Sequence, residues 1–218
     1  MSFSVFAEEI LPVCLIEDDK VLSKNSCYGT INIGEDFVYE GEFLNTHLNG
    51  VGIFIWLKKN VFSEYVGEFK DDKIHGNGKI TWVNGDVYIG DFLEGKQEGW
   101  GKKIFSNGNK YEGEFYNGYF NGIGKYADTK GNTYEGNFKN GNFEGIGNMI
   151  YGNGDTYQGK WKEGKRDGKG IWLSVIDISS YKGNWKGGLP DGAGVMTYKD
   201  GKKEKGIFLD GKLVKLTD

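Results

Sequence analysis

The 218-residue chain has only two cysteines, two prolines and two histidines. Cys14 and Cys27 are too few for a disulfide framework and form no Cys-x-x-Cys pair, so we expect a reducing compartment. The scarcity of proline excludes collagen and proline-rich linkers. His47 and His75 have no cysteine partner at the spacing of a metal site, so we predict neither a bound metal nor any other cofactor.

Long apolar runs are also missing. No stretch approaches the roughly 18 residues that a membrane-spanning helix needs. The first residues lack a basic start, and Glu8 and Glu9 precede any longer apolar run, which is unlike a signal peptide. Motifs for myristoylation and prenylation are absent as well. We therefore expect a soluble, cytoplasmic protein.

Neither sign of charge is in large excess. The chain carries 27 basic and 31 acidic residues, for a net charge of −4. Residues 1–110 hold 11 basic and 17 acidic side chains, and residues 111–218 hold 16 and 14. Binding to nucleic acid would require a strongly basic face, so we predict no nucleic-acid partner.

Glycine and aromatic residues are abundant, with 37 glycines and 15% aromatic residues. A motif of the form Tyr-x-Gly-x-Phe/Trp accounts for many of them and recurs 23 to 26 residues apart. Such a period indicates a repeat array, in which each unit contacts mainly its neighbours. The motifs begin at Tyr39, Tyr65, Tyr88, Tyr111, Tyr134, Tyr157 and Tyr181.

One repeat, residues 65–87, predicts two short strands. Tyr65, Gly67 and Phe69 alternate with other residues and share one face of an extended strand. A polar break and a second alternating segment follow, and Asn84-Gly85 has the sequence of a type I′ hairpin turn. The predicted fold is all-β: an elongated, solenoid-like ribbon of antiparallel hairpins, with one hairpin per repeat of about 23 residues.

The ends of the array are less regular. Residues 27–38 form a partial repeat, residues 39–203 form seven full repeats, and residues 204–218 form a degenerate half repeat. Residues 1–26 show no repeat, and we expect them to cap the first hairpin; docking of a partner is the alternative. Unpaired strand edges at the two ends of a ribbon also predict a homodimer or larger assembly through these ends.

The pattern Tyr-Glu-Gly-Glu-Phe-x-Asn-Gly-x-x-x-Gly-x-Gly, as in residues 111–124, resembles the MORN (membrane occupation and recognition nexus) repeat. The resemblance covers residues 27–211. It implies a scaffold or adaptor of the kind found in cilia and flagella (radial spokes and axonemes), in cortical cytoskeletons or beside membranes. Some members carry an enzyme domain after the array. Because this chain ends at Asp218, we expect no such domain and no enzymatic activity.

A single-layer ribbon with many aromatic residues predicts a groove that binds a protein segment, either a helix or an extended peptide. The alternative is that these rings only stack on their neighbours in the core. The candidate partner-binding residues are Tyr88, Phe92, Tyr111, Phe115, Tyr126, Tyr134, Phe138 and Tyr151.

A second functional hypothesis is a peripheral membrane or phosphoinositide-binding module that tethers partners to a membrane. Anionic lipids attract clustered lysine and arginine, and the best cluster comprises Lys160, Lys162, Lys165 and Arg166. The negative net charge of the chain argues against direct membrane binding. Catalysis has less support still, because the Gly-x-Gly pairs lie within strands and do not open a helix as phosphate-binding loops do.

Overall fold

The structure is a computed structural model that describes residues 11–57 and 62–217. Within these residues the regular secondary structure consists of β-strands, with no helix that could cross a membrane. The chain divides into two compact units, Met1–Lys96 (unit 1) and Gln97–Asp218 (unit 2). The first ten residues of the predicted N-terminal cap lie outside the described residues.

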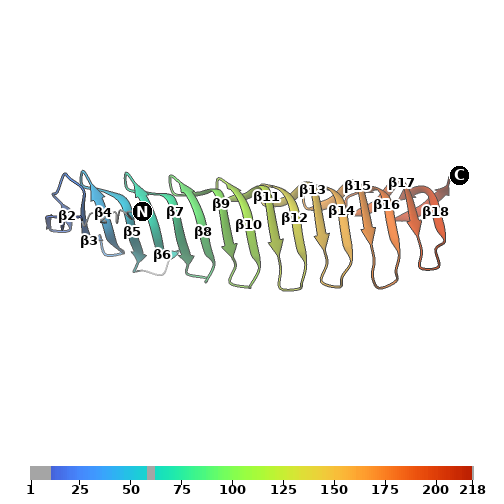
Figure 1. Cartoon of the computed structure of the whole chain (residues 1–218), viewed down its shortest axis with the longest axis horizontal. Helices are drawn as coiled ribbons and strands as arrows, with labels where there is room; N and C mark the ends of the chain where they lie inside the picture. The colour runs from blue at the N-terminus through green and yellow to red at the C-terminus, as the bar shows by residue number, and fades with distance from the viewer. Residues whose placement is uncertain (1–10, 58–61, 218) are drawn as a thin grey trace, which may run out of the picture. The chain divides into compact units, whose positions relative to one another are not determined.

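Unit 1 contains a two-stranded sheet, β1 with β2, and a larger antiparallel sheet in which β3 to β8 pair in chain order (Figure 1). Its strands are β1 (Ile16–Glu17), β2 (Lys20–Val21), β3 (Cys27–Ile33), β4 (Phe37–Leu44), β5 (His47–Trp56), β6 (Phe62–Lys70), β7 (Lys73–Trp82) and β8 (Val87–Leu93).

Unit 2 is an antiparallel sheet in which each strand again pairs with the next along the chain. Its strands are β9 (Lys96–Ile104, from the unit boundary), β10 (Lys110–Tyr116), β11 (Tyr119–Ala127), β12 (Thr133–Lys139), β13 (Asn142–Ile150), β14 (Thr156–Lys162), β15 (Lys165–Leu173), β16 (Ser180–Lys186), β17 (Leu189–Thr197), β18 (Lys203–Leu209) and β19 (Lys212–Leu216). The predicted all-β fold of successive antiparallel hairpins is confirmed.

The core of each repeat is a tyrosine ring that lies on two glycines. In β12, Tyr134 is completely buried, and its hydroxyl donates a hydrogen bond to the carbonyl of Asn137 at 2.9 Å. The ring crosses Gly136 and its partner in β13, Gly147. A Cβ atom added at Gly147 would collide with the ring and hydroxyl of Tyr134. Only glycine therefore lets the ring reach the backbone.

Within each unit, the Phe or Trp of a motif joins its repeat to the one before it. The ring of Phe138 packs edge-on against Tyr134 of its own repeat, with centroids 5.1 Å apart, and against Tyr111 of the preceding repeat at 4.9 Å. In unit 1, Phe69 packs in the same way against Tyr65 at 5.1 Å and Tyr39 at 5.0 Å. Aromatic side chains bury about 150–250 Å² each and favour this edge-to-face geometry. These contacts make the core continuous within each unit.

One of the two kinds of turn differs from the sequence prediction. A type I′ turn needs positive φ at both central residues, and Asp71 (φ 48°) and Asp72 (φ 64°), which join β6 to β7, satisfy this. In the Asn84-Gly85 turn only Gly85 is left-handed, at φ 88°. The Gly85 amide donates to the carbonyl of Trp82 and the Trp82 amide to that of Asp86. This turn is therefore a three-residue loop, and the prediction of a type I′ turn there was wrong.

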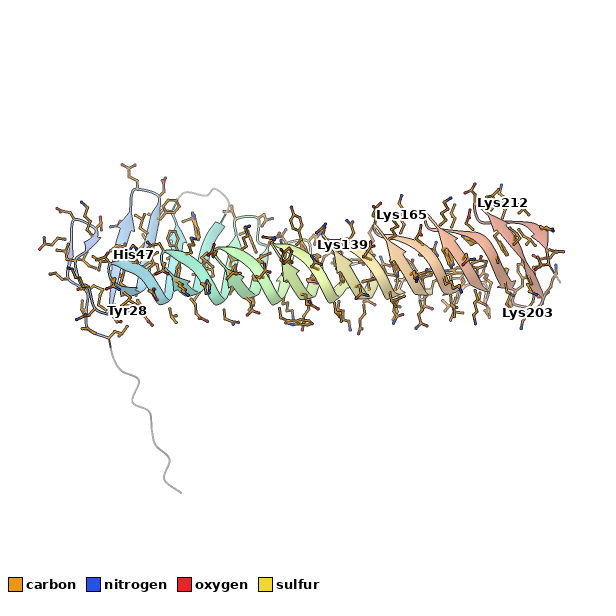
Figure 2. The ribbon with its side chains drawn as sticks, turned by 90° about the horizontal axis from the view of Figure 1, so that it is seen from above. Tyr28, His47, Lys139, Lys165, Lys203 and Lys212 are labelled. Atoms are coloured by element: carbon orange, nitrogen blue, oxygen red, sulfur yellow. A yellow bond between two sulfur atoms is a disulfide. The ribbon has the colours of Figure 1, made fainter. Side chains whose placement is uncertain are left out.

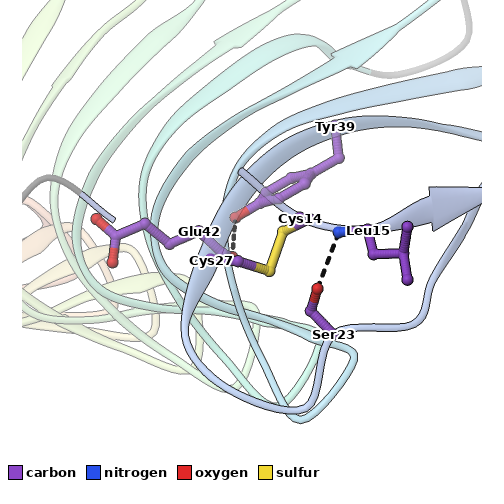
Figure 3. The surroundings of a disulfide bond; sticks show 6 residues. All are labelled: Cys14, Leu15, Ser23, Cys27, Tyr39 and Glu42. Atoms are coloured by element: carbon purple, nitrogen blue, oxygen red, sulfur yellow. Dashed lines mark hydrogen bonds between the residues drawn. A yellow bond between two sulfur atoms is a disulfide. The ribbon is translucent and has the colours of Figure 1, made fainter. Parts of the chain in front are cut away.

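The cysteines also differ from the prediction. Cys14 and Cys27 form a disulfide (Figure 3). The expectation of a reducing compartment rested on the lack of a disulfide framework, so this bond removes its support. The bond holds a segment along β3, where the Tyr28 amide donates to the carbonyl of Pro12 at 2.9 Å and the Cys14 amide to that of Tyr28 at 3.0 Å. Figure 3 also shows the Leu15 amide donating to the Ser23 hydroxyl. Part of the β3 edge is thereby hydrogen-bonded.

A methyl group at the glycine pair should destabilise the fold. We expect Gly147→Ala to lower the free energy of unfolding by about 1–3 kcal/mol, because its Cβ overlaps the ring of Tyr134. Gly141→Asn is the matched control, since a Cβ there meets open space and asparagine tolerates its left-handed backbone. Urea unfolding measures both, and equal losses in the two variants would contradict tyrosine-on-glycine packing.

Stability should also fall at alkaline pH. Burial raises the pKa of Tyr157 to about 12 and also raises the pKa values of Tyr39, Tyr65, Tyr111, Tyr134 and Tyr181. Because an unfolded tyrosine has a pKa of about 10, these residues contribute stability fully below pH ~10 and lose it as pH rises further. Urea midpoints from pH 8 to 12 test this. Tyr134→Phe should reduce the decline in the free energy of unfolding by about 1.4 kcal/mol per pH unit. An unchanged slope in this variant would contradict the contribution of the buried tyrosine.

Candidate functional site

Six of the eight predicted partner-binding rings lie in the core. Their exposed fractions are 0% for Tyr88, Tyr111 and Tyr134, 3% for Phe115 and Phe138 and 5% for Phe92. They point to the same side as the motif glycines, and neighbouring rings and backbone already cover them. The prediction that these six present an open surface to a partner is therefore corrected. Tyr126 and Tyr151 remain half-buried, with part of each side chain exposed.

The inner face, meaning the side of each sheet to which the motif tyrosines point, carries other side chains in unit 2. Tyr126 of β11 lies opposite both Tyr111 and Tyr134 in the register. Trp172 of β15 holds the same position between Tyr157 and Tyr181. Because these positions recur on every second strand, they lie about 10 Å apart. From β11 to β17 the series is Tyr126, Met149, Trp172 and Met196.

A second series covers the tyrosines from the inside. The ring of Phe120 stacks on Tyr111 with a centroid distance of 3.7 Å, and Phe143 stacks on Tyr134 at 3.9 Å. Arg166 takes the same place in the next repeat, 4.2 Å from the ring centroid of Trp185, and donates to the carbonyl of Gly188 at 2.7 Å. The sequence prediction missed Phe120 and Phe143, although each stands two residues before its Gly-x-Gly pair.

An open pocket of about 780 Å³ lies against the inner face of unit 2. Trp172, Met196 and Tyr198 supply its apolar lining. The wide turn between β15 and β16 supplies Asp177 and Ser179, and the Ser174 amide closes that turn by donating to the Ser179 carbonyl at 2.8 Å. Hydrogen bonds from the hydroxyls of Ser174 and Ser179 lower the pKa of Asp177. The longer turn of this repeat thus places a carboxylate at the rim of an aromatic pocket.

The predicted basic cluster does not form one surface. Lys162 and Lys165 lie opposite each other beside a hairpin turn, whereas Arg166 points to the inner face and contacts Tyr157 and Trp185. Lys160 points to the opposite, outer face. Figure 2 shows Lys165 on one edge of unit 2 with other turn lysines, and Lys203 on the other edge. The proposed contact of all four residues with one anionic surface is therefore corrected.

Unit 1 has its own pocket of about 780 Å³, which includes Asp18, Asp19, Leu48 and Asp72. At its margin the His47 Nδ1 atom lies 2.5 Å from the Asp72 carboxylate, which also accepts the Leu48 amide at 2.8 Å. The Asp72 hydrogen bond and charge raise the pKa of His47. In the described residues, no group of three His, Cys, Asp or Glu side chains could hold a metal ion.

No curated protein matches the chain. Among solved structures, it is similar to the TCP domain of SAS-4 (dCPAP) of Drosophila melanogaster, solved in complex with a proline-rich motif of Ana2 (dSTIL). The two chains share 12% identity with a TM-score of 0.39, and the match covers 82% of this chain and 88% of that one.

A family model of the MORN repeat matches seven segments of the chain. They are residues 39–60, 65–87, 88–110, 111–133, 134–156, 157–175 and 181–203. Each segment begins at the tyrosine that packs on a glycine pair, and together the segments make up more than half of the sequence. The chain therefore belongs to the MORN repeat family.

Proposed function

We propose that the chain is a non-catalytic scaffold that binds an apolar segment of a partner protein on the inner face of unit 2. Repeats of this family suggest a protein-interaction scaffold in general terms. The observation that carries the finer proposal is the pocket formed by Trp172, Met196 and Tyr198. Half-exposed tryptophan and tyrosine are the side chains that most often dominate binding energy at protein interfaces.

The repeat spacing fits a linear partner. Successive inner-face positions, such as Tyr126 and Met149, lie on alternate strands and are about 10 Å apart. An extended peptide rises about 3.3 Å per residue, so about every third side chain would meet one position. A helix rises 1.5 Å per residue, so about every seventh side chain would do so. Either form of partner contacts several repeats through a few apolar anchors.

The cellular setting is part of the same proposal. We propose that the scaffold acts in the cytoplasm, within a ciliary, axonemal or cortical cytoskeletal assembly. The support for this setting is the resemblance of the repeats to those of scaffolds in such assemblies.

Position-specific photo-crosslinking tests the binding face. Tyr198, which lines the pocket, is replaced by p-benzoylphenylalanine in the full-length chain and irradiated in extract of the native cells. We expect defined adducts with one or a few proteins, because the probe lies where the segment docks. The matched control is the same replacement at Tyr116, a more exposed tyrosine beside a turn.

The second arm of this experiment adds Trp172→Ala to the Tyr198 probe, with thermal unfolding as the check that the repeats still fold. The adducts should be lost or at least tenfold weaker, since removing an aromatic anchor costs more than about 1.4 kcal/mol at a binding hot spot. Identical adducts from the Tyr198 and Tyr116 probes, or adducts that survive Trp172→Ala unchanged, would refute inner-face binding.

A further inference from the structure

The two units carry net charges of opposite sign. Unit 1, residues 1–96, holds 8 basic and 16 acidic residues, for a formal charge of −8. Unit 2, residues 97–218, holds 19 basic and 15 acidic residues, for a formal charge of +4. This difference extends to the outer faces, the sides of the sheets opposite the tyrosine core, where the side chains on either side of each motif glycine point away from the core.

The outer face of unit 2 is basic and apolar over β14 to β18. The ten positions that flank its glycines, all in the described part of the chain, include four lysines and no acidic residue. Ile171, Ala193, Val195 and Ile207 lie among these lysines, and part of the face is a hollow of about 610 Å³. The lysines are Lys160, Lys169, Lys182 and Lys205.

The outer face of unit 1 has the complementary composition. The corresponding positions of β3 to β8 carry four carboxylates and only one lysine, Lys79. Apolar side chains again lie between the charges, and Val51 and Ile89 are exposed to 54% and 49%. The carboxylates are Glu40, Glu42, Glu68 and Asp91.

Some of these charged side chains form no ion pair in the part of the chain that the structure describes. Among the described residues, no ion pair joins Lys160, Lys169 or Lys182 to a carboxylate. Glu40 accepts a hydrogen bond from the Tyr28 hydroxyl at 3.0 Å, and Glu68 accepts one from the Asn77 amide at 2.9 Å. Both donors are neutral, so each carboxylate keeps its net charge.

We propose that the outer face of unit 1 binds the outer face of unit 2 of a second copy of this chain. Both faces are built on the same strand spacing, so rows of carboxylates and lysines can lie opposite each other with apolar side chains between them. A second contact of the same kind between the other two units would make this dimer symmetric. Pairing of like faces would oppose carboxylates to carboxylates, so charge selects the reciprocal arrangement.

The apolar contacts and the charges have separate roles in this dimer. Exposed ion pairs contribute only about 0–1 kcal/mol each, so burial of side chains such as Val51 against the hollow beside Ile171 supplies most of the affinity. The charges set the orientation and the rate of association, and salt screens them over about 10 Å at 0.1 M. The dimer should therefore weaken as ionic strength rises.

Charge-swap variants of the full chain test the proposal by sedimentation equilibrium at low salt. Glu40→Lys with Glu68→Lys makes both outer faces of that variant basic, and Lys169→Glu with Lys182→Glu introduces carboxylates on the face of unit 2. We expect the unaltered chain to be dimeric and each variant alone to dissociate at least tenfold more readily. An equimolar mixture of the two variants should form a heterodimer, because each face again meets its opposite.

The double variant Lys130→Glu with Lys139→Glu is the matched control. It changes the net charge by the same amount as Lys169→Glu with Lys182→Glu, but at and beside hairpin turns, and it leaves the ten outer-face positions of β14 to β18 unchanged. This control should stay dimeric. An unaltered chain that is monomeric at all concentrations overturns the proposal and assigns the basic face to an acidic partner of another kind. Failure of the mixture to associate, or dissociation of the control to the same extent, also overturns it.

Discussion

The packing of a tyrosine ring on a pair of glycines is the interaction on which the rest of this structure depends. Tyr134 reaches the backbone only because Gly136 and Gly147 have no side chain, and its hydroxyl then bonds to the Asn137 carbonyl 2.9 Å away. The buried ring needs this bond, because a buried hydroxyl without a partner costs about 1–3 kcal/mol. The following Phe or Trp packs edge-on against two successive tyrosines, which links the repeats into a continuous core in each unit.

This packing also determines which side chains remain for binding. The motif tyrosines are buried in the core. The inner face therefore presents the side chains of the second strand of each repeat, such as Trp172. The outer face has no core to form, and its residues vary from one repeat to the next: carboxylates dominate in unit 1 and lysines over β14 to β18. The same repeating framework thus carries two surfaces of different composition. We assign the inner face to a partner segment and the outer face to a second copy of the chain.

The hairpin fold could be predicted from the sequence because one local signal, the alternation around the glycines, recurs in every repeat. The burial of Tyr88 and Tyr134 could not, because alternation shows which residues share a face but not whether anything covers that face. Phe120 supplies part of the cover from a strand whose contribution the motif does not reveal. The disulfide depended on residues 12–14 lying along β3, a contact outside the repeat pattern. The type I′ turn was predicted at the wrong loop, because an Asn-Gly sequence fits both a two-residue and a three-residue hairpin loop.

Nitration of tyrosines by tetranitromethane, followed by peptide mapping, tests the central claim most directly. The reagent attacks accessible phenolate, and burial removes access and also raises the pKa of Tyr134. The account predicts that Tyr116 and Tyr119, exposed to 57% and 59%, react in the folded chain while Tyr111 and Tyr134 react only after unfolding. Nitration of Tyr134 in the folded chain at the rate of Tyr119 would contradict the tyrosine core.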